Sequence, residues 1–458
     1  MPVSRSSPPR AELVRQLGFF SSTALVISNM IGAGIFATTG FMARDLGSAK
    51  LILLCWGVGA VFALAGALSY SELGINFPSS GGEYVYLTQA YGPEWGFMTG
   101  WVSFFAGFSA PIAAAGLAFS DYLGHLFPVV ATYHVIGSGA WALHLGAAQL
   151  VASCLILAFT ILNCFGVGRV AKVQNVLTAT KVAVIAGFVI FGFASGNGSW
   201  QHFSEPAVRG SAISLPAQFV VSLLFVMFGY SGWNAATYVA EEVHRPERTL
   251  PAALAAGTAI VTALYLGLNL VLIYATPLEK MKDEIAVGSL AAANLWGPNI
   301  AGFISALMAI SIMATVSAEV TIGPRVYYAM AKNRAFFRSA ATVHPRWHTP
   351  VVAILSQGLF AMLMTLTPFP DLVIYIGFSL TLFTVLSVGS VFIFRRNRPG
   401  WQRLKALDIA WPLIPVLYIL VGTVMMLYGV ATHPVASLAA LATVGLGALV
   451  YHFRRQAE

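Results

Sequence analysis

The sequence is poor in charged residues. Only 9% of its 458 residues are Asp, Glu, Lys or Arg, whereas soluble domains carry about 25%. Hydrophobic residues make up 58% of the chain, and the mean hydropathy is +0.77. A soluble chain of this length needs a charged surface around its domains. The composition therefore excludes an ordinary soluble protein. It predicts an all-α membrane protein, folded as one bundle whose outer surface faces the lipid bilayer.

Other features are scarce or missing. The cysteines, Cys55, Cys154 and Cys164, all lie in apolar runs, so no disulfide framework is expected. No GxxxxGK[ST] phosphate loop occurs, which argues against an ATP-driven pump. The polar segment 1–16 has no small-residue cleavage site after a short apolar stretch. We therefore expect a cytoplasmic N-terminal tail there and not a signal peptide.

The histidines do not suggest a catalytic or metal site. His125, His134 and His144 are scattered, without local Asp, Ser or Cys partners, so an enzyme triad is not supported. His344 and His348 have a spacing that metals can use, but they lie in a basic loop without an acidic or Cys partner. We expect neither an enzyme nor a bound metal or cofactor.

Apolar runs long enough to cross ~30 Å of hydrocarbon recur along the chain. We predict twelve transmembrane helices, separated by loops that carry Pro, Gly and charged residues. They cover residues 17–43, 51–75, 95–120, 145–166, 174–194, 216–240, 250–275, 299–323, 350–367, 372–394, 410–431 and 435–453. No soluble domain interrupts them, although residues 277–298 are long enough for a short amphipathic helix.

The lysines and arginines test this arrangement. With the N-terminus in the cytoplasm, the inner segments collect 19 of the 25 basic residues. The outer segments hold only Arg44, Lys50, Arg209, Lys280 and Lys282. This bias follows the positive-inside rule, and an error in one span would invert every later loop. The distribution of basic residues therefore indicates that both termini lie in the cytoplasm, and no nucleic-acid partner is expected. We expect the protein to be a multi-pass protein of the plasma membrane.

Two of the predicted spans carry glycine-rich interruptions near their middle, at residues 31–36 and 228–234. Glycines there permit unwinding, although helix packing explains either site alone equally well. The pair is more informative, because five spans separate the two sites and the halves must be inverted. Paired interruptions of this kind indicate a transporter with its substrate site at mid-membrane.

The chemistry of such breaks suits a zwitterion. A half-helix starting near Gly34 presents free N–H groups and the positive end of its dipole to a carboxylate. Carbonyls left open at the ends of the preceding half-helices suit an ammonium group. An α-amino acid carries both groups one carbon apart, so the breaks favour an amino acid substrate.

Three segments of the sequence resemble signatures of the amino acid–polyamine–organocation (APC) superfamily. They are Asn29–Phe36 in the first span, Tyr70–Gly74 with Phe77–Tyr84 after the second, and the segment from Phe228 through Glu241-Glu242 to Pro251 in the sixth. The third segment resembles the L-type amino acid transporter branch most closely. The resemblance covers about residues 15–400.

The resemblance implies a LeuT-type 5+5 inverted repeat in which helices 1 and 6 are discontinuous. A transporter core would then cover residues 17–400, with repeats at 17–194 and 216–394. Residues 401–458 would add two C-terminal helices and a short cytoplasmic tail.

The resemblance also implies a set of substrate-binding residues. Backbone N–H groups around Ala33 and Gly34 would meet the carboxylate, and Phe228 would close over the substrate as an aromatic gate. The remaining contacts would come from carbonyls or pocket walls at Met30, Ile31, Gly229, Ser231, Trp233 and Asn234. Many relatives have Ser at the position of Ala33, so a hydroxyl contact to the carboxylate is missing here.

Charged residues inside spans are costly and usually functional. By resemblance, Lys181 in the fifth span would hold the first helix in place of a sodium ion, couple occupancy to gating, and carry any coupled proton. The alternative is that Lys181 snorkels to the cytoplasmic interface. Glu319 is a weaker coupling candidate, because an interhelical hydrogen bond is commoner than a direct role. Glu72 is expected to pair with arginines of the inner loops.

The predicted function is secondary amino acid transport, by sodium-independent exchange or proton symport. Neither break contains an acidic residue, and Asn234 stands where some relatives for cationic substrates carry Glu, so neutral amino acids are favoured. A cationic amino acid or polyamine carrier is the alternative within this fold, and a non-transporting sensor would need a longer tail. The loop 121–144 lacks the cysteine through which eukaryotic L-type members join an accessory glycoprotein, so no disulfide-linked subunit is expected.

Overall fold

The protein is described here by a computed structural model. The structure describes residues 15, 17–79, 81–137, 143–165, 167–332, 336–347 and 349–457. Most of the predicted N-terminal tail and His348 lie outside these residues.

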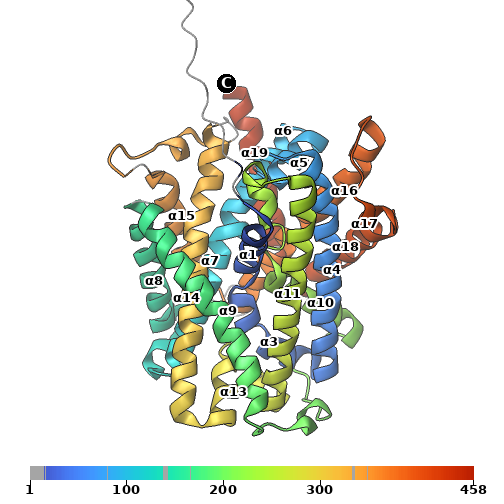
Figure 1. Ribbon diagram of the computed structural model, residues 1–458. Coiled ribbons are helices and arrows are strands. Elements are labelled where there is room, and N and C mark those ends of the chain that lie inside the picture. The colour runs from blue at the N-terminus through green and yellow to red at the C-terminus, as the bar shows by residue number, and fades with distance from the viewer. Residues whose placement is uncertain are drawn as a thin grey trace, which may run out of the picture.

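The first half of the chain forms a bundle of helices with one hairpin (Figure 1). Its elements are α1 (Phe19–Met30), α2 (Ala33–Ala37), α3 (Thr39–Leu46), α4 (Ala49–Asn76), α5 (Glu83–Tyr91), α6 (Pro93–Val102), the π-helical η1 (Ser103–Ser109), α7 (Ala110–Gly124), η2 (Pro128–Ala131), β1 (Tyr133–Ile136), β2 (Leu143–Gly146), α8 (Ala147–Cys164) and α9 (Val167–Ala194).

The regular elements described in the second half are all helices. Its elements are η4 (Trp200–Phe203), α10 (Leu215–Tyr230), η5 (Ala235–Glu242), α11 (Pro246–Ala275), α12 (Leu278–Met281), α13 (Val287–Trp296), α14 (Pro298–Lys332), η6 (Arg338–Ala341), α15 (Val351–Met364), α16 (Phe369–Asn397), α17 (Lys405–Asp408), α18 (Leu413–Thr432) and α19 (Pro434–Ala457).

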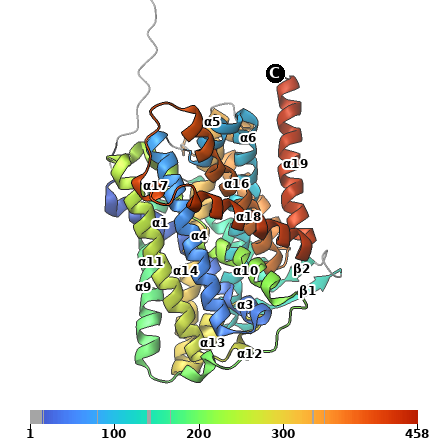
Figure 2. The same ribbon diagram turned by 90° about the vertical axis from the view of Figure 1, so that its right-hand side faces the viewer.

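The long apolar helices are consistent with the twelve predicted spans. Within the described residues, ten helices are long and apolar enough to cross a membrane, and two shorter apolar helices cover Ala179–Ala194 and Val351–Met364. These correspond in order to the twelve predicted spans. The last two are peripheral: only 28% and 22% of their apolar windows are buried, against 78% for α16. Figure 2 shows α19 along the edge of the bundle.

The bundle has two distinguishable ends. The C-terminus, α5 and the start of α6 lie at one end, called the terminal end below, whereas α3, α12 and α13 lie at the far end (Figures 1 and 2). The predicted short helix within residues 277–298 is present as α12 and α13.

Matching elbows at the two ends display the inverted repeat. Each elbow is a short helix, α5 or α13, followed by a glycine and then a proline that starts a long helix. The glycines, Gly92 and Gly297, have φ of 104° and 84°, values that favour glycine. The following prolines, Pro93 and Pro298, take the first helical position, where a missing N–H costs nothing. Five spans apart, the two elbows lie at opposite ends of the bundle, as an inverted repeat requires.

The hairpin β1–β2 departs from the predicted loop at 121–144. Its strands pair antiparallel, with Tyr133 opposite Gly146. A Cβ at Gly146 would lie 2.4 Å from the Cα of Tyr133, so glycine lets the two backbones approach. Only four residues form each strand, which is too few for a clear alternating pattern in the sequence.

Two broken helices and the candidate substrate site

The first break lies between α1 and α2. Ile31 and Gly32 adopt extended conformations, with ψ of 95° and −164°, and the helix resumes at Ala33. The discontinuity of helix 1 is therefore present where the glycines predict it. No side chain caps the start of α2, so its first N–H groups are placed to meet a ligand.

The second break follows α10, which ends at Tyr230. Ser231 is extended, with ψ of 146°, and Gly232 has φ of 96° before the chain continues as the 3₁₀ helix η5. A Cβ at Gly232 would lie 2.7 Å from the backbone of Asn29. Both the left-handed conformation and this close approach require glycine. Helix 6 is thus also discontinuous.

The two breaks meet backbone to backbone. A Cβ added at Gly34 would lie 2.6 Å from the Cα of Gly229. Ala33 and Phe228 beside this contact are only 2% and 6% exposed. The structure therefore brings together the residues predicted to recognise the substrate from the two halves of the chain.

Tyr265 of α11 links the two breaks and was not identified from the sequence. Its buried hydroxyl lies 2.6 Å from the carbonyl oxygen of Met30 and 2.9 Å from that of Gly229. One O–H proton is shared by two acceptors, so it bridges the end of α1 and the end of α10. The available signal was a pair of polar residues, Tyr265 and Asn269, one helical turn apart in an apolar span.

Lys181 of α9 approaches the first break. Its Nζ donates to the carbonyl oxygens of Ser28, at 2.9 Å, and Ile31, at 2.7 Å. The residue is 1% exposed, so its ammonium group points into the bundle and does not snorkel to the interface. These bonds satisfy carbonyls that the end of α1 leaves open.

Glu319 of α14 lies in the electrostatic field of Lys181. Its buried Oε2 has no hydrogen-bond partner. The interhelical bond at this residue involves its backbone oxygen, which accepts from Gln357 at 3.2 Å. An ordinary interhelical hydrogen bond of the side chain therefore does not account for the burial of this carboxylate.

Trp233 and Asn234 brace the second break. Trp233 packs edge-on against Tyr70, with ring centroids 4.8 Å apart. Asn234 donates from Nδ2 to Glu83 at 2.8 Å. The resemblance leaves open whether these two residues line the pocket or support it. The contacts described here are of the supporting kind.

Glu83, at the start of α5, is the centre of a buried network that the sequence analysis did not single out. Its carboxylate accepts from the hydroxyls of Tyr70, at 2.7 Å, and Tyr238, at 2.8 Å, in addition to Asn234. Burial raises the pKa of Glu83, and the three hydrogen bonds oppose this shift. All three donors are neutral, so this carboxylate is stabilised without an ion pair in the described structure. The start of α5 is thereby tied to η5.

Further contacts close the terminal end. Leu17, just before α1, exchanges backbone hydrogen bonds of 2.9 Å with Glu242 and His244 at the end of η5. Glu72 accepts from Arg395, near the end of α16, at 2.6 and 2.7 Å, so its predicted pairing with an arginine is present.

An aromatic layer closes the other side of the breaks. The hydroxyl of Tyr122 donates to the carbonyl oxygen of Phe36 at 2.8 Å. Phe41 of α3 stacks on Phe369 and Phe225, with centroids 5.7 and 6.2 Å apart. The breaks are thus enclosed from both ends in this conformation.

Two discontinuous helices that meet across an inverted repeat define a LeuT-type transporter. A family model described as "Amino acid permease" matches residues 17–449, and the chain belongs to this family of amino acid transporters.

Individual relatives agree with this assignment. The serine/threonine exchanger SteT of Bacillus subtilis (strain 168) is 31% identical over 414 residues, which cover 89% of each chain. The large neutral amino acids transporter small subunit 2 of Rattus norvegicus is 29% identical, over 96% of this chain and 80% of its own. The crystal structure of MhsT in complex with L-phenylalanine is similar in fold, with a TM-score of 0.58 at 14% identity, over 95% of this chain and 100% of its own.

Proposed function

We propose that the protein exchanges neutral amino acids across the cytoplasmic membrane by alternating access around its two broken helices. The observation that carries this proposal is the contact of Gly34 with Gly229, which places an uncapped helix start beside the open carbonyl ends of two half-helices. Such a place complements both charged groups of an α-amino acid.

The substrate carboxylate would bind the N–H groups of Ala33 and Gly34. Its ammonium group would bind carbonyls of Met30, Phe228 and Ser231, with Ile31 and Gly229 adjacent. Several of these oxygens already accept a hydrogen bond from Tyr265, Lys181 or Ser231. A carbonyl has two lone pairs, so those of Met30 and Ile31 can accept a second donor. The Phe228 carbonyl already accepts from both the N–H and the hydroxyl of Ser231, and the substrate would replace one of these donors.

Substrate entry requires the breaks to separate. Gly34 and Gly229 leave no room between them for even one additional carbon. The conformation described here is therefore the closed form, and loading involves movement of α1–α2 relative to α10. Phe228, which flanks the contact, would close over the bound substrate.

Exchange without sodium is the coupling that the site favours. The ammonium group of Lys181 occupies the space beside the Ser28 and Ile31 carbonyls, where a sodium ion would otherwise neutralise the same oxygens. SteT, the relative at 31% identity, is described as an exchanger. Proton symport through Lys181 and Glu319 is the second candidate, because the Glu319 carboxylate has a buried oxygen without a partner.

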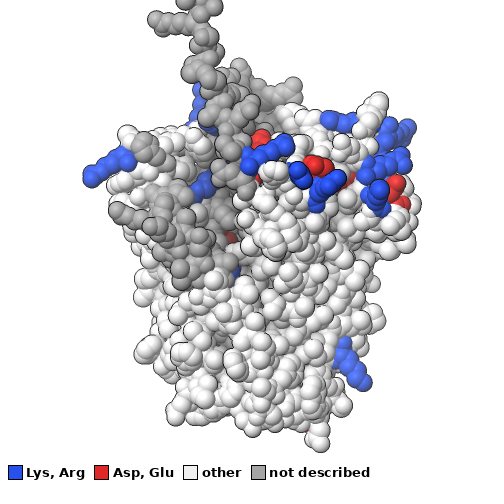
Figure 3. Space-filling view, in the orientation of Figure 1, with Lys and Arg blue, Asp and Glu red and all other residues white. Residues whose placement is uncertain are grey.

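Membrane orientation follows from charge. Lys and Arg side chains gather over the terminal end, and the lower part of the face in Figure 3 is almost free of them. By the positive-inside rule we place the terminal end and both termini in the cytoplasm. We also propose that no disulfide-linked subunit is needed, since residues 121–144 contain no cysteine.

Uptake of labelled alanine, leucine and lysine into proteoliposomes tests these proposals. We expect alanine and leucine to enter only vesicles preloaded with unlabelled amino acid. Uptake into empty vesicles under an inward proton gradient would contradict exchange and indicate proton symport. Uptake of lysine but not of alanine or leucine would contradict the neutral substrates and indicate a carrier of cationic amino acids.

Asn234→Glu tests selectivity within the same assay. The new carboxylate would lie close to Glu83 and the second break, so we expect weaker leucine uptake and a gain of lysine uptake. Unchanged selectivity would contradict the assignment of this position.

A further inference from the structure

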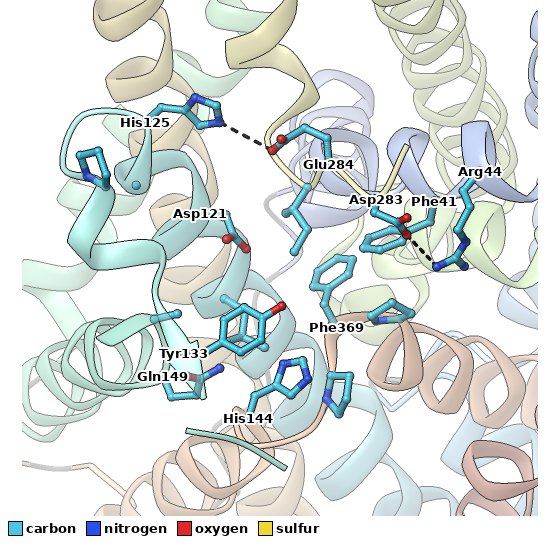
Figure 4. A pocket seen from close by; sticks show the side chains of 17 residues that line it. Phe41, Arg44, Asp121, His125, Tyr133, His144, Gln149, Asp283, Glu284 and Phe369 are labelled. Carbon is cyan, nitrogen blue, oxygen red and sulfur yellow. Dashed lines mark hydrogen bonds and ion pairs between the residues drawn. The ribbon is translucent and has the colours of Figure 1, made fainter. Parts of the chain in front are cut away.

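A cavity of about 630 Å³ opens at the far end of the bundle. It lies between α3, the end of α7, the hairpin, α8, the segment before α13 and the start of α16 (Figure 4). The cavity is separate from the breaks, because the aromatic layer of Phe36, Tyr122 and Phe41 lies between them.

The lining of this cavity carries excess negative charge. Its charged groups are Arg44 and the carboxylates of Asp121, Asp283 and Glu284, together with His125 and His144. Arg44 is neutralised locally, because it bonds Asp45 and Asp283, each at 2.7 Å. Asp121 and Glu284 remain, and they interact electrostatically across the cavity. Charge therefore favours a ligand that presents an ammonium group to the cavity.

Two polar side chains in the lining lack hydrogen-bond partners in the described structure, although Asp121 also interacts electrostatically with Glu284 and His125. Asp121 forms no hydrogen bond or ion pair with the described part of the chain, and its carboxylate points into the hollow in Figure 4. Gln149 is 4% exposed, lines the same hollow, and its Oε1 has no hydrogen-bond partner. Buried polar groups without partners are costly, so these groups are suited to receive a donor from a ligand.

Glu284 supplies a second acceptor. It accepts from the Ala286 N–H at 2.9 Å, and the same oxygen lies 3.6 Å from His125. Burial acts to raise the pKa of Glu284, but these two neighbours outweigh it and leave the pKa below its usual value. Glu284 therefore stays ionised near neutral pH, with its other oxygen available.

The lining suits a small organic ligand better than a metal ion. Among the described residues, no group of three His, Cys, Asp or Glu side chains is arranged to hold a metal. The walls include the rings of Phe41, Tyr133 and Phe369, and aromatic faces attract ammonium groups. Acidic acceptors with aromatic walls suit a small primary ammonium compound.

We propose that the far-end cavity is an access subsite that binds the ammonium group of the incoming amino acid between Asp121 and Glu284. The identification of this ligand rests on the proposed transport function. Tyr122, the residue after Asp121, donates to the Phe36 carbonyl and accepts from the Gly288 N–H at 3.3 Å. A ligand held by Asp121 therefore lies directly outside the layer that must open to admit it.

Two readouts test this subsite. In cells that express the protein, Asp121→Asn is expected to raise the KM for leucine uptake about tenfold, and the maximal rate should change less than about twofold. Glu284→Gln should raise KM by a smaller factor. Asp283→Asn is the matched control: it removes the same charge from the same cavity, but its carboxylate already bonds Arg44, so KM should stay at the wild-type value.

The second readout does not require transport. Propylammonium chloride should raise the melting temperature of the purified wild-type protein more than sodium chloride does, and Asp121→Asn should abolish the difference. Wild-type uptake together with an unchanged KM in Asp121→Asn would overturn the subsite and leave the proposed function standing. Absence of wild-type uptake would overturn the proposed function, and the propylammonium result would then decide the ammonium site independently.

Discussion

The two breaks are supported by groups of opposite charge. At the first, the ammonium group of Lys181 donates to the carbonyl oxygens of Ser28 in α1 and Ile31 in the break. At the second, Asn234 bonds the carboxylate of Glu83, which is held by two tyrosine hydroxyls. The first support acts directly on open backbone, whereas the second acts through side chains on the segment after the break.

The two supports act on corresponding halves of helices 1 and 6, the halves nearest the terminal end. Lys181 satisfies carbonyls at the end of α1, so it controls the half-helix nearest the terminal end. Glu83 holds η5, the corresponding half of helix 6, against the elbow of α5. Tyr265 donates to carbonyls at both breaks, so we propose that movement of either half-helix alters the proposed substrate site.

Of the substitutions at the two supports, replacement of Lys181 should reduce leucine exchange most. Lys181→Met removes two charge-assisted hydrogen bonds, to the carbonyl oxygens of Ser28 and Ile31. At about 1.5 kcal/mol or more for each bond, exchange should fall roughly 100-fold. Leucine exchange by monodisperse protein is the measurement, with the exposed Lys50→Met as the control. Exchange within threefold of wild type would show that the first break does not need its cation.

Glu83→Gln should reduce leucine exchange less, roughly tenfold, because the amide oxygen still accepts from some of the three donors. Glu247→Gln, at the exposed start of α11, is the matched control and should leave exchange unchanged. A double variant with Tyr238→Phe should be less than additive, since both residues belong to one network. Full additivity would argue that Glu83 and Tyr238 act separately.

The same residue predicts a pH dependence of stability. The pKa of Glu83 in the folded protein lies above its ordinary value of 4.5, so the folded state binds the proton more tightly. Lowering the pH from neutral towards 4.5 should therefore stabilise the wild type relative to Glu83→Gln. Melting temperatures of the two proteins across this range are the measurement. A constant difference between them would contradict the raised pKa.

Tyr265→Phe should have the smallest effect. It removes one neutral hydroxyl worth about 1 kcal/mol, so we expect roughly fivefold slower exchange and a lower melting temperature. Tyr428→Phe on the peripheral α18 is the control for loss of a hydroxyl. If both quantities match wild type, the bridge between Met30 and Gly229 contributes nothing.

Much of this architecture could be predicted, and the reasons are physical. Membrane spans need long apolar runs, and breaks need glycines such as Gly32 and Gly232, so both are visible in the sequence. A lysine inside a span is equally conspicuous.

Side-chain networks across the fold are less visible. Glu83 lies in a loop-like Gly-Gly-Glu segment, and its partner Tyr238 is 155 residues away. In the sequence, Tyr265 resembles any aromatic residue of a membrane helix. Its role depends on the ends of α1 and α10, which bring two carbonyl oxygens to its hydroxyl. The hairpin and its cavity depend in the same way on contacts between distant segments.

Binding of labelled leucine to the Gly34→Ala variant tests the central claim most directly. The added Cβ would lie 2.6 Å from Gly229, so the breaks could not close again over a bound amino acid, and binding should weaken at least ~50-fold. Gly57→Ala, where a Cβ meets nothing within 4 Å, should bind like wild type. If folded, monodisperse Gly34→Ala bound leucine with wild-type affinity, the amino acid site would not lie between the two breaks.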